Sequence, residues 1–409
     1  MMAISLKARC DARMFEITKA RFNRRQWLSA AALASGAVLF GLDRLIRPRI
    51  AAARQENGFQ RGKKLGEIDF VDEARVPMGE AFGAELDGRL YTDLSGMTAE
   101  DSTTPTEHFY IRTRASNLLE SQKPWSVQVS GQGGRPVDLS IEELRRMAGP
   151  RGLHLMECAG NTRSVHFGMI SVANWTGTPL AEVLERAKAK PHAKRVLISG
   201  FDRYAAKSAS SVPGASWVFT TEELTKAGGF LATEMNGSPL TRDHGAPVRL
   251  VVPGWYGCTC IKWVNEITFP DEIVAATSQM QEYAARTMQS GVPQLARDYK
   301  PAIIEQAAMP IRVEKWAIDE TIKYRVVGVL WGGSVPVTKL QIRFNPEEDY
   351  VDVDNFRQTT NDPWSFWTHS WAPKRPGTYM IRLRVADPGV VARRLEAGYY
   401  VRNVEVLEI

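Results

Sequence analysis

Cysteine is scarce in this sequence. The 409 residues include four cysteines, and none of them stands in a CxxC or CxxCH arrangement. Zinc ribbons and covalently attached c-type haem both require such pairs, so the sequence predicts neither. We therefore expect no haem in this chain, and we expect any haem-bearing partner to be a separate protein.

Most of the chain also lacks an excess of charge of either sign. The first 53 residues hold ten Lys and Arg against three Asp and Glu, an excess of seven positive charges, whereas the whole chain carries +6. Residues 54–409 are therefore left with one net negative charge. A nearly neutral body gives no electrostatic basis for binding a polyanion, and we expect no nucleic-acid partner.

A long hydrophobic run is missing near the N-terminus. Residues 29–42 are apolar, but this stretch is too short for a comfortable membrane span. It follows Arg24-Arg25-Gln26-Trp27-Leu28, which resembles a twin-arginine export signal, and Ala51-Ala52-Ala53 is the expected cleavage region. We predict that residues 1–53 direct a folded protein, with its cofactor already inserted, to the periplasm. A basic amphipathic start to a soluble domain and an uncleaved anchor are the alternatives.

The composition is that of a folded protein. With 44% hydrophobic and 24% charged residues, the chain can bury a large core and fill two or three domains. A disordered scaffold and a collagen-like rod are excluded. Residues 54–105 are polar and rich in loop-forming residues, so we predict an irregular N-terminal segment there.

Residues 106–300 predict a mixed α+β domain. Residues 125–130 alternate apolar and polar side chains before a glycine-rich turn, which indicates a strand entering a hairpin. A helix is expected after Thr178-Pro179. Two further helix N-termini are predicted by capping boxes, namely Ser140 with Glu143 and Thr220 with Glu223. These short elements show no βαβ rhythm, which favours α+β over a parallel α/β fold.

Residues 301–409 predict a second, all-β domain. Residues 340–344 and 379–385 alternate apolar with polar side chains, which is typical of half-buried antiparallel strands. Roughly a hundred residues of short strands without helices fit an immunoglobulin-like sandwich.

One segment carries the chemistry, Glu157-Cys158-Ala159-Gly160-Asn161-Thr162-Arg163-Ser164. A single cysteine followed by two small residues lets a bulky cofactor approach the backbone, and Arg163 places a fixed cation near the thiolate. A buried structural cysteine at a strand end is the alternative, and the residues alone leave both interpretations open.

This segment resembles the molybdenum-ligating motif of the sulfite oxidase family. Other parts of the chain resemble that family's motifs in the same order, and the β-rich end resembles its dimerisation domain. The matching segments are residues 104–112, 233–237, 242–249, 252–254, 260–263 and 297–300.

The resemblance implies a molybdenum–molybdopterin cofactor (Moco). Cys158 is expected to ligate molybdenum beside the two dithiolene sulfurs of the pterin, because soft sulfur suits a redox metal. The expected catalytic residues are Arg112, Arg163, Tyr299 and Arg402; the arginines supply cations for an oxyanion, and the tyrosine hydroxyl orients substrate or passes a proton. Besides Cys158, the expected cofactor contacts are Phe109, Tyr110, Arg112, Asp202, His244, Arg249, Cys260, Ile261 and Lys262. Cys258 and Cys260 are one residue apart, which predicts packed thiols rather than a relaxed disulfide.

The resemblance further implies a homodimeric sulfite dehydrogenase that oxidises sulfite to sulfate and passes electrons to an external acceptor such as cytochrome c. One alternative is a sulfoxide reductase of the same superfamily, since those enzymes resemble the central domain but generally lack the C-terminal sandwich. Another is an inactive exported binding protein, against which the intact Cys158 argues.

Overall fold

The computed structural model of the chain describes residues 58–71, 73–100, 102–121, 124–131, 136–188, 193–208, 210–358 and 360–409. The predicted export signal, residues 1–53, lies outside the described residues. Among the described residues, no helix combines the length and the apolar character needed to cross a membrane.

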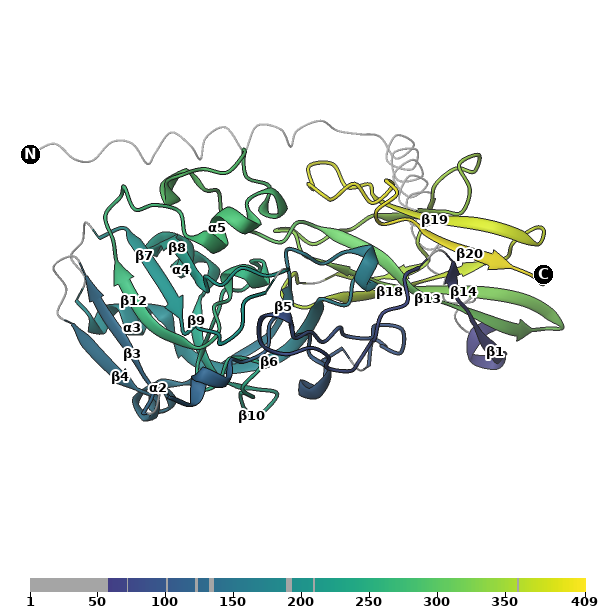
Figure 1. Ribbon diagram of the computed structural model, residues 1–409. Helices are drawn as coiled ribbons and strands as arrows, with labels where there is room; N and C mark the ends of the chain where they lie inside the picture. Colours follow the sequence, from purple (N-terminus) through teal and green to yellow (C-terminus); the bar gives the residue numbers. More distant parts are fainter. Residues whose placement is uncertain are drawn as a thin grey trace, which may run out of the picture. The chain divides into compact units, whose positions relative to one another are not determined.

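The first sheet of the 106–300 region presents the cysteine motif. Its strands run in the order β10-β9-β6-β5, with β11 paired to β9, and all of these pairs are antiparallel. Strand β5 ends at Glu157, directly before Cys158 (Figure 1). The strands are β5 (Gly149–Glu157), β6 (Ile170–Pro179), β9 (Phe230–Met235), β10 (Ser238–Pro239) and β11 (Arg249–Val251).

The second sheet of this region has the order β4-β3-β12-β7-β8. The pair of β12 and β3 is parallel, whereas the other pairs are antiparallel. The hairpin predicted after residue 125 is confirmed as β3 and β4, and Val127 and Val129 are fully buried. The strands are β3 (Ser126–Gly131), β4 (Val137–Ser140), β7 (Arg195–Gly200), β8 (Ser216–Thr220) and β12 (Val264–Phe269).

The three predicted helices are present, and both capping boxes form. In the first box, the Glu143 amide donates to the Ser140 hydroxyl at 3.2 Å, and the Ser140 amide donates to the Glu143 carboxylate at 3.0 Å. A fourth helix, α5, was not predicted; Thr277 caps its N-terminus. The α-helices are α2 (Ile141–Met147), α3 (Leu180–Arg186), α4 (Thr221–Ala227) and α5 (Ser278–Tyr283). The 3-10 turns are η1 (Glu85–Asp87), η2 (Thr106–His108), η3 (Asn117–Ser121), η4 (Arg163–Val165), η5 (Gly257–Thr259), η6 (Ala285–Thr287) and η7 (Ala296–Asp298).

The C-terminal region contains two antiparallel five-stranded sheets, which fit the predicted sandwich (Figure 1). One has the order β1-β13-β14-β18-β17, and the other has the order β16-β15-β19-β20-β2. Buried residues alternate along β19, as the sequence predicts. The strands are β13 (Ala307–Ile318), β14 (Thr321–Trp331), β15 (Leu340–Arg343), β16 (Val351–Asp352), β17 (Asn355–Phe356), β18 (Ser365–Trp371), β19 (Gly377–Val385) and β20 (Arg402–Val406).

The N-terminal segment differs from the prediction. Residues 54–105 were expected to be irregular, yet they contain β1 (Lys63–Ile68) and β2 (Phe70–Val71), which pair with β13 and β20. Each strand lies at the edge of one C-terminal sheet. Strand β1 is short, largely exposed and rich in lysine, and such edge strands lack the apolar alternation that marks a strand in sequence. The fold is therefore an α+β region followed by two sheets that the N-terminal segment helps to complete.

Candidate functional site

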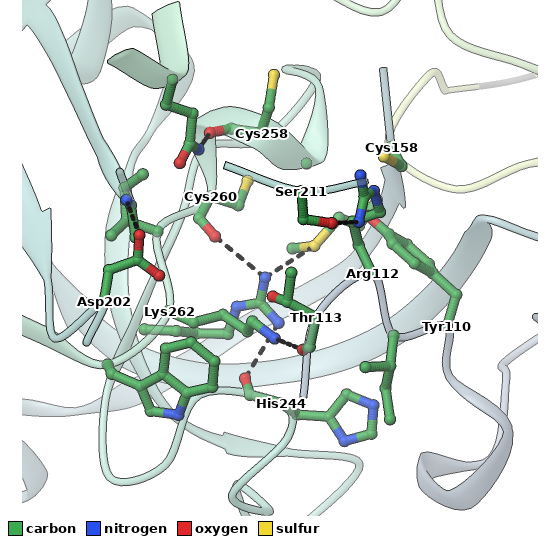
Figure 2. A pocket seen from close by; sticks show the side chains of 18 of the residues that line it. Tyr110, Arg112, Thr113, Cys158, Asp202, Ser211, His244, Cys258, Cys260 and Lys262 are labelled. Atoms are coloured by element: carbon green, nitrogen blue, oxygen red, sulfur yellow. Dashed lines mark hydrogen bonds between the residues drawn. The ribbon is translucent and has the colours of Figure 1, made fainter. Parts of the chain in front are cut away.

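A cavity lies where the cysteine motif meets several segments that are distant from it in sequence. Its empty volume is about 830 Å³, which includes space that opens to solvent. Figure 2 shows the side chains that line it. The lining comes from residues 109–113, 156–158, 243–249, 257–263 and 279–283, with further contributions from Asp202 and residues 211–215.

Cys158 is buried in the cavity wall with 4% of its surface exposed. Its amide donates to the carbonyl of Met169 at 2.9 Å, and the amide of Gly160 donates to its sulfur at 3.4 Å. Burial raises the pKa of the Cys158 thiol, although the Arg112 guanidinium and the Gly160 amide oppose that rise. The protein alone therefore holds a thiol here, and a bound metal ion would displace its proton.

Three cations face the same cavity. The Arg112 guanidinium donates to the Ser211 hydroxyl at 2.9 Å, whereas Arg249, which is 4% exposed, donates to the carbonyls of His244 at 3.1 Å and Cys260 at 3.2 Å. The Lys262 ammonium donates to the carbonyls of Thr113 and Asp243. In the part of the chain that the structure describes, none of the three cations forms an ion pair with a carboxylate. The carboxylates of Asp202, Asp243 and Glu282 also line the cavity, but none of them pairs directly with these cations among the described residues, so the cations can still bind an anionic ligand.

Burial and neighbouring charge also tune Lys262. Burial and the nearby Arg249 lower the pKa of Lys262 to about 7, so its charge depends on what occupies the cavity. Gly245 allows this crowding, because it adopts a φ of +104° and a Cβ there would lie 3.0 Å from the Cβ of Arg249 and 3.1 Å from that of Lys262. The glycine therefore brings two cationic side chains close to one turn of backbone.

His244 joins two walls of the cavity. Its Nε2 lies 3.0 Å from the carbonyl of Phe109, and its Nδ1 lies 2.7 Å from the hydroxyl of Thr241. A carbonyl only accepts, so Nε2 carries the proton and Nδ1 accepts from Thr241. Burial lowers the pKa of His244 to about 4, which keeps the ring neutral at physiological pH.

The other predicted cofactor contacts also lie at the cavity. Phe109 packs behind Tyr110, with ring centroids 5.5 Å apart, and Tyr110 and Ile261 belong to the lining. The Asp202 carboxylate accepts from the amides of Gly214 and Ala215, which fixes a loop beside the cavity. Cys158, Cys258 and Cys260 are free, buried thiols, in agreement with the prediction from the spacing of the last two.

Three of the four predicted catalytic residues lie outside the cavity lining. The Arg163 guanidinium is turned toward the carbonyl of Val71 at 3.4 Å. Tyr299 packs edge-on against Trp217, and its hydroxyl is buried without a partner. Arg402 pairs with Glu73 and lies over the rings of Phe70 at 4.7 Å and Phe167 at 5.3 Å. A sequence motif fixes the position of a backbone, whereas these side chains are directed by partners far away in sequence.

The structure brings other residues to the site that the motifs did not reveal. Tyr283, at the end of α5, lines the cavity, and Arg286 lies over its ring at 5.5 Å. A Cβ built on Gly160 would be 3.3 Å from an Arg286 guanidinium nitrogen and 3.7 Å from the Cys158 sulfur, so both groups approach the same point. The sequence signal for this wall is the N-cap at Thr277, which marks the start of α5.

Comparison with known proteins assigns the site to a class. Residues 115–277 match the family described as "Oxidoreductase molybdopterin binding domain". The chain is 30% identical over 361 residues to mitochondrial sulfite oxidase of Macaca fascicularis, a match that covers 82% of this chain and 62% of the relative. It is 32% identical over 192 residues to the catalytic subunit of the protein-methionine-sulfoxide reductase MsrP of Xanthomonas campestris, covering 43% of this chain and 56% of the relative.

The fold has a solved counterpart as well. The sulfane dehydrogenase SoxCD from Paracoccus pantotrophus superposes with a TM-score of 0.58 at 17% identity, covering 84% of this chain and 90% of that chain. The chain spans between 45% and 62% of the length of the first three curated relatives that it matches. Residues 115–277 thus form a domain of the molybdopterin-binding oxidoreductase class. Within that class, the segments that match are similar to sulfite oxidases.

The residues of the cavity fit the cofactor of this class. Moco combines a soft-ligand metal with a hydrogen-bonding pterin and a phosphate. Three thiols line the cavity, those of Cys158, Cys258 and Cys260, and Lys262 lies in the same lining (Figure 2). The lining also contains the Arg249 cation. Among the described residues, the Nε of Arg249 is buried without a partner, so this donor is available to a ligand in the cavity.

Proposed function

We propose that this protein oxidises sulfite to sulfate and passes the electrons to an external acceptor such as cytochrome c. The observation that supports this most is the pairing of one buried thiol, Cys158, with the Arg112 cation in the same cavity. A soft metal ligand beside a fixed positive charge suits redox chemistry on a small oxyanion.

The cofactor would be held by groups at both ends of the cavity. Cys158 would supply the protein's metal ligand. Arg249 and Lys262 would hold the phosphate and the pterin, with neutral His244 fixing the wall between them. When bound, Moco supplies the two-electron redox change and the exchangeable oxygen of the reaction.

The chain's own residues would then bind and orient the substrate. Arg112 is already held by Ser211 at 2.9 Å, so a sulfite oxygen would meet a preorganised guanidinium. Arg286 supplies a second positive charge at the same wall. The Tyr283 hydroxyl lies in the lining, and burial raises its pKa, so it stays a neutral donor.

The test is sulfite-dependent reduction of cytochrome c by protein purified with its metal. We expect turnover that sulfate inhibits and that scales with the molybdenum content of the preparation. Metal-loaded protein that leaves cytochrome c and artificial acceptors oxidised in the presence of sulfite would contradict the proposal.

A sulfoxide reductase is the second candidate, and the similarity to MsrP supports it. Reduction of methionine sulfoxide with an artificial electron donor, compared with sulfite oxidation on the same preparation, separates the two. We expect oxidation to dominate, since the macaque sulfite oxidase match covers 82% of this chain and the MsrP match 43%. An inactive binding protein would show neither reaction, and the intact Cys158 argues against it.

Export and assembly remain proposals as well. Lysines in place of Arg24 and Arg25 should leave the precursor in the cytoplasm, and normal periplasmic accumulation would refute export by the twin-arginine route. The C-terminal sandwich should form a two-fold interface that yields a homodimer. Light scattering at micromolar concentration that finds only monomer mass would contradict it.

A further inference from the structure

Glu157, the residue before Cys158, is a buried carboxylate with 1% of its surface exposed. Arg393 grips both of its oxygens, with one guanidinium nitrogen at 2.9 Å from the first and the other at 2.7 Å from the second. The indole of Trp331 donates to the carboxylate at 2.9 Å, and the Asn161 amide donates to it at 3.3 Å. Asn161 lies in the cysteine motif, whereas Trp331 and Arg393 come from the C-terminal region.

Arg393 reaches this position from the C-terminal region. Its amide donates to the carbonyl of Gln306 at 2.9 Å, which fixes its backbone next to the start of β13. Its guanidinium lies 5.5 Å from the ring of Tyr256 and 5.7 Å from that of Trp331, and it also donates to the Tyr256 hydroxyl at 2.8 Å. One side chain therefore contacts both the end of β5 and the segment that leads into η5.

We propose that Arg393 is a positioning residue that clamps the two cavity walls bearing Cys158 and η5, an inference that rests on the proposed function. The clamp acts through Glu157 and Tyr256, since Arg393 itself is not part of the cavity lining. Its two terminal guanidinium nitrogens donate to Glu157 and to the Tyr256 and Tyr400 hydroxyls, so the end of the side chain is occupied by protein groups.

The chemistry explains why an arginine stands here. A planar guanidinium engages both carboxylate oxygens at once and so fixes direction as well as distance, whereas an ammonium makes point contacts. The carboxylate belongs to the residue next to Cys158, so holding Glu157 in place also restrains the backbone that carries the sulfur. The C-terminal region thereby contributes to the geometry of the metal ligand.

The experiment compares Arg393→Met and Arg393→Lys with Arg325→Met in the purified holoprotein. Arg325 is the matched control, because it also pairs with a buried carboxylate, Glu314 at 2.8 Å, but it lies on β14 away from the cavity. Two readouts are used. Hydrogen exchange is followed at the amides of Cys158 and Tyr256, which bond to Met169 and Ala302. The electron paramagnetic resonance signature of the reduced metal reports the sulfur geometry.

We expect Arg393→Met to speed exchange at both amides at least about tenfold, to change the resonance signature and to lower kcat more than it raises KM. Arg393→Lys should change the same readouts by less. If Arg393→Met fails to fold, the lysine variant tests whether Arg393 clamps the two walls. Arg325→Met should speed exchange in β13 and β14 while leaving both amides and the signature unchanged.

Wild-type exchange and signature in both Arg393 variants would overturn the clamp. Equal effects of Arg325→Met on the two amides would overturn it too, because a general loss of stability would then explain the result. The molybdenum content of the wild type tests the proposed function separately. If the wild type binds no molybdenum, the proposed function fails, and hydrogen exchange still decides whether Arg393 clamps the two walls.

Discussion

Two buried regions of this molecule treat charge in opposite ways. In the C-terminal sheets, Glu314 is 2% exposed and accepts from Arg312 and Arg325 at 2.8 Å each and from the Trp316 indole at 3.0 Å. Burial would raise its pKa, but these donors prevail and lower it to about 2. The charge is fully compensated within the protein.

The cavity pairs none of its three cations directly with a carboxylate among the described residues, although Asp202, Asp243 and Glu282 also line it. Arg112, Arg249 and Lys262 donate only to hydroxyl, carbonyl and sulfur groups, and within the described residues none pairs with a carboxylate. The C-terminal sheets pair the buried Glu314 carboxylate with arginines, whereas the cations around the buried Cys158 thiol form no such pair. The difference teaches that the cavity is built for an anionic ligand, whereas the Glu314 cluster is built for stability.

The largest effect should come from Cys158→Ser. A hard, protonated hydroxyl replaces a soft thiolate, so turnover should fall at least about a hundredfold, since even the outer partners of metal ligands are worth 10–100-fold. The pterin should stay bound, because Arg249, Lys262 and His244 anchor it. Steady-state kinetics measure turnover, and pterin fluorescence after denaturation measures the bound pterin. Wild-type turnover in Cys158→Ser would contradict the assignment of the cavity as the catalytic site.

The second-largest effect on sulfite kinetics should come from Arg112→Met, and Arg163→Met should have a much smaller effect. Arg112 lines the cavity, so losing a charge-assisted contact of about 1.5–3 kcal/mol should raise the sulfite KM roughly tenfold to a hundredfold. Arg163 contacts the Val71 carbonyl instead, so its variant should change KM less than about threefold. Kinetics of the two purified variants decide this, and a larger effect at Arg163 would reverse the assignment.

Lys262 should give the cofactor-free protein a distinct pH dependence. Its ordinary pKa of 10.5 falls to about 7 in the folded protein because of burial. Between these values the unfolded chain holds a proton that the folded site has released, so stability rises with pH from about 7 to 10.5, on the order of a few kcal/mol. Urea unfolding across this range should show the rise in the wild type. In Lys262→Met the rise should be absent, and an identical rise there would assign it to another group.

The smallest effect on turnover is expected for Arg402→Met. Arg402 forms a buried pair with Glu73 outside the cavity, and removing one partner of such a pair costs about 3–5 kcal/mol of stability. We therefore expect a lower melting temperature with sulfite kinetics unchanged. A raised KM in the folded variant would show that Arg402 belongs to the substrate site after all.

Local chemistry made much of this structure predictable. Capping boxes predict the N-termini of α2 and α4, because the two residues that accept hydrogen bonds from the first amides are three positions apart. The alternation in β19 reflects a strand with one buried face. The residue types around Cys158 left a structural cysteine open, and the cofactor class was predicted from the resemblance of this motif to the sulfite oxidase family.

The remaining features depend on contacts between distant segments. Arg163 turns toward β2, in a segment predicted to be irregular, and Arg402 turns toward Glu73 in the same part of the chain. The pair of Glu157 and Arg393 joins residues 236 positions apart, and no local pattern marks it. Side-chain direction at these positions is a property of the assembled sheets, which the motifs do not encode.

The central claim is that Cys158 is the protein's ligand to molybdenum in the cavity. X-ray absorption at the molybdenum edge tests it directly on the wild type and on Cys158→Ser. The account predicts bound molybdenum in both proteins and one sulfur neighbour fewer around the metal in the variant. Equal sulfur coordination in the two proteins, or a wild type without molybdenum, would contradict it.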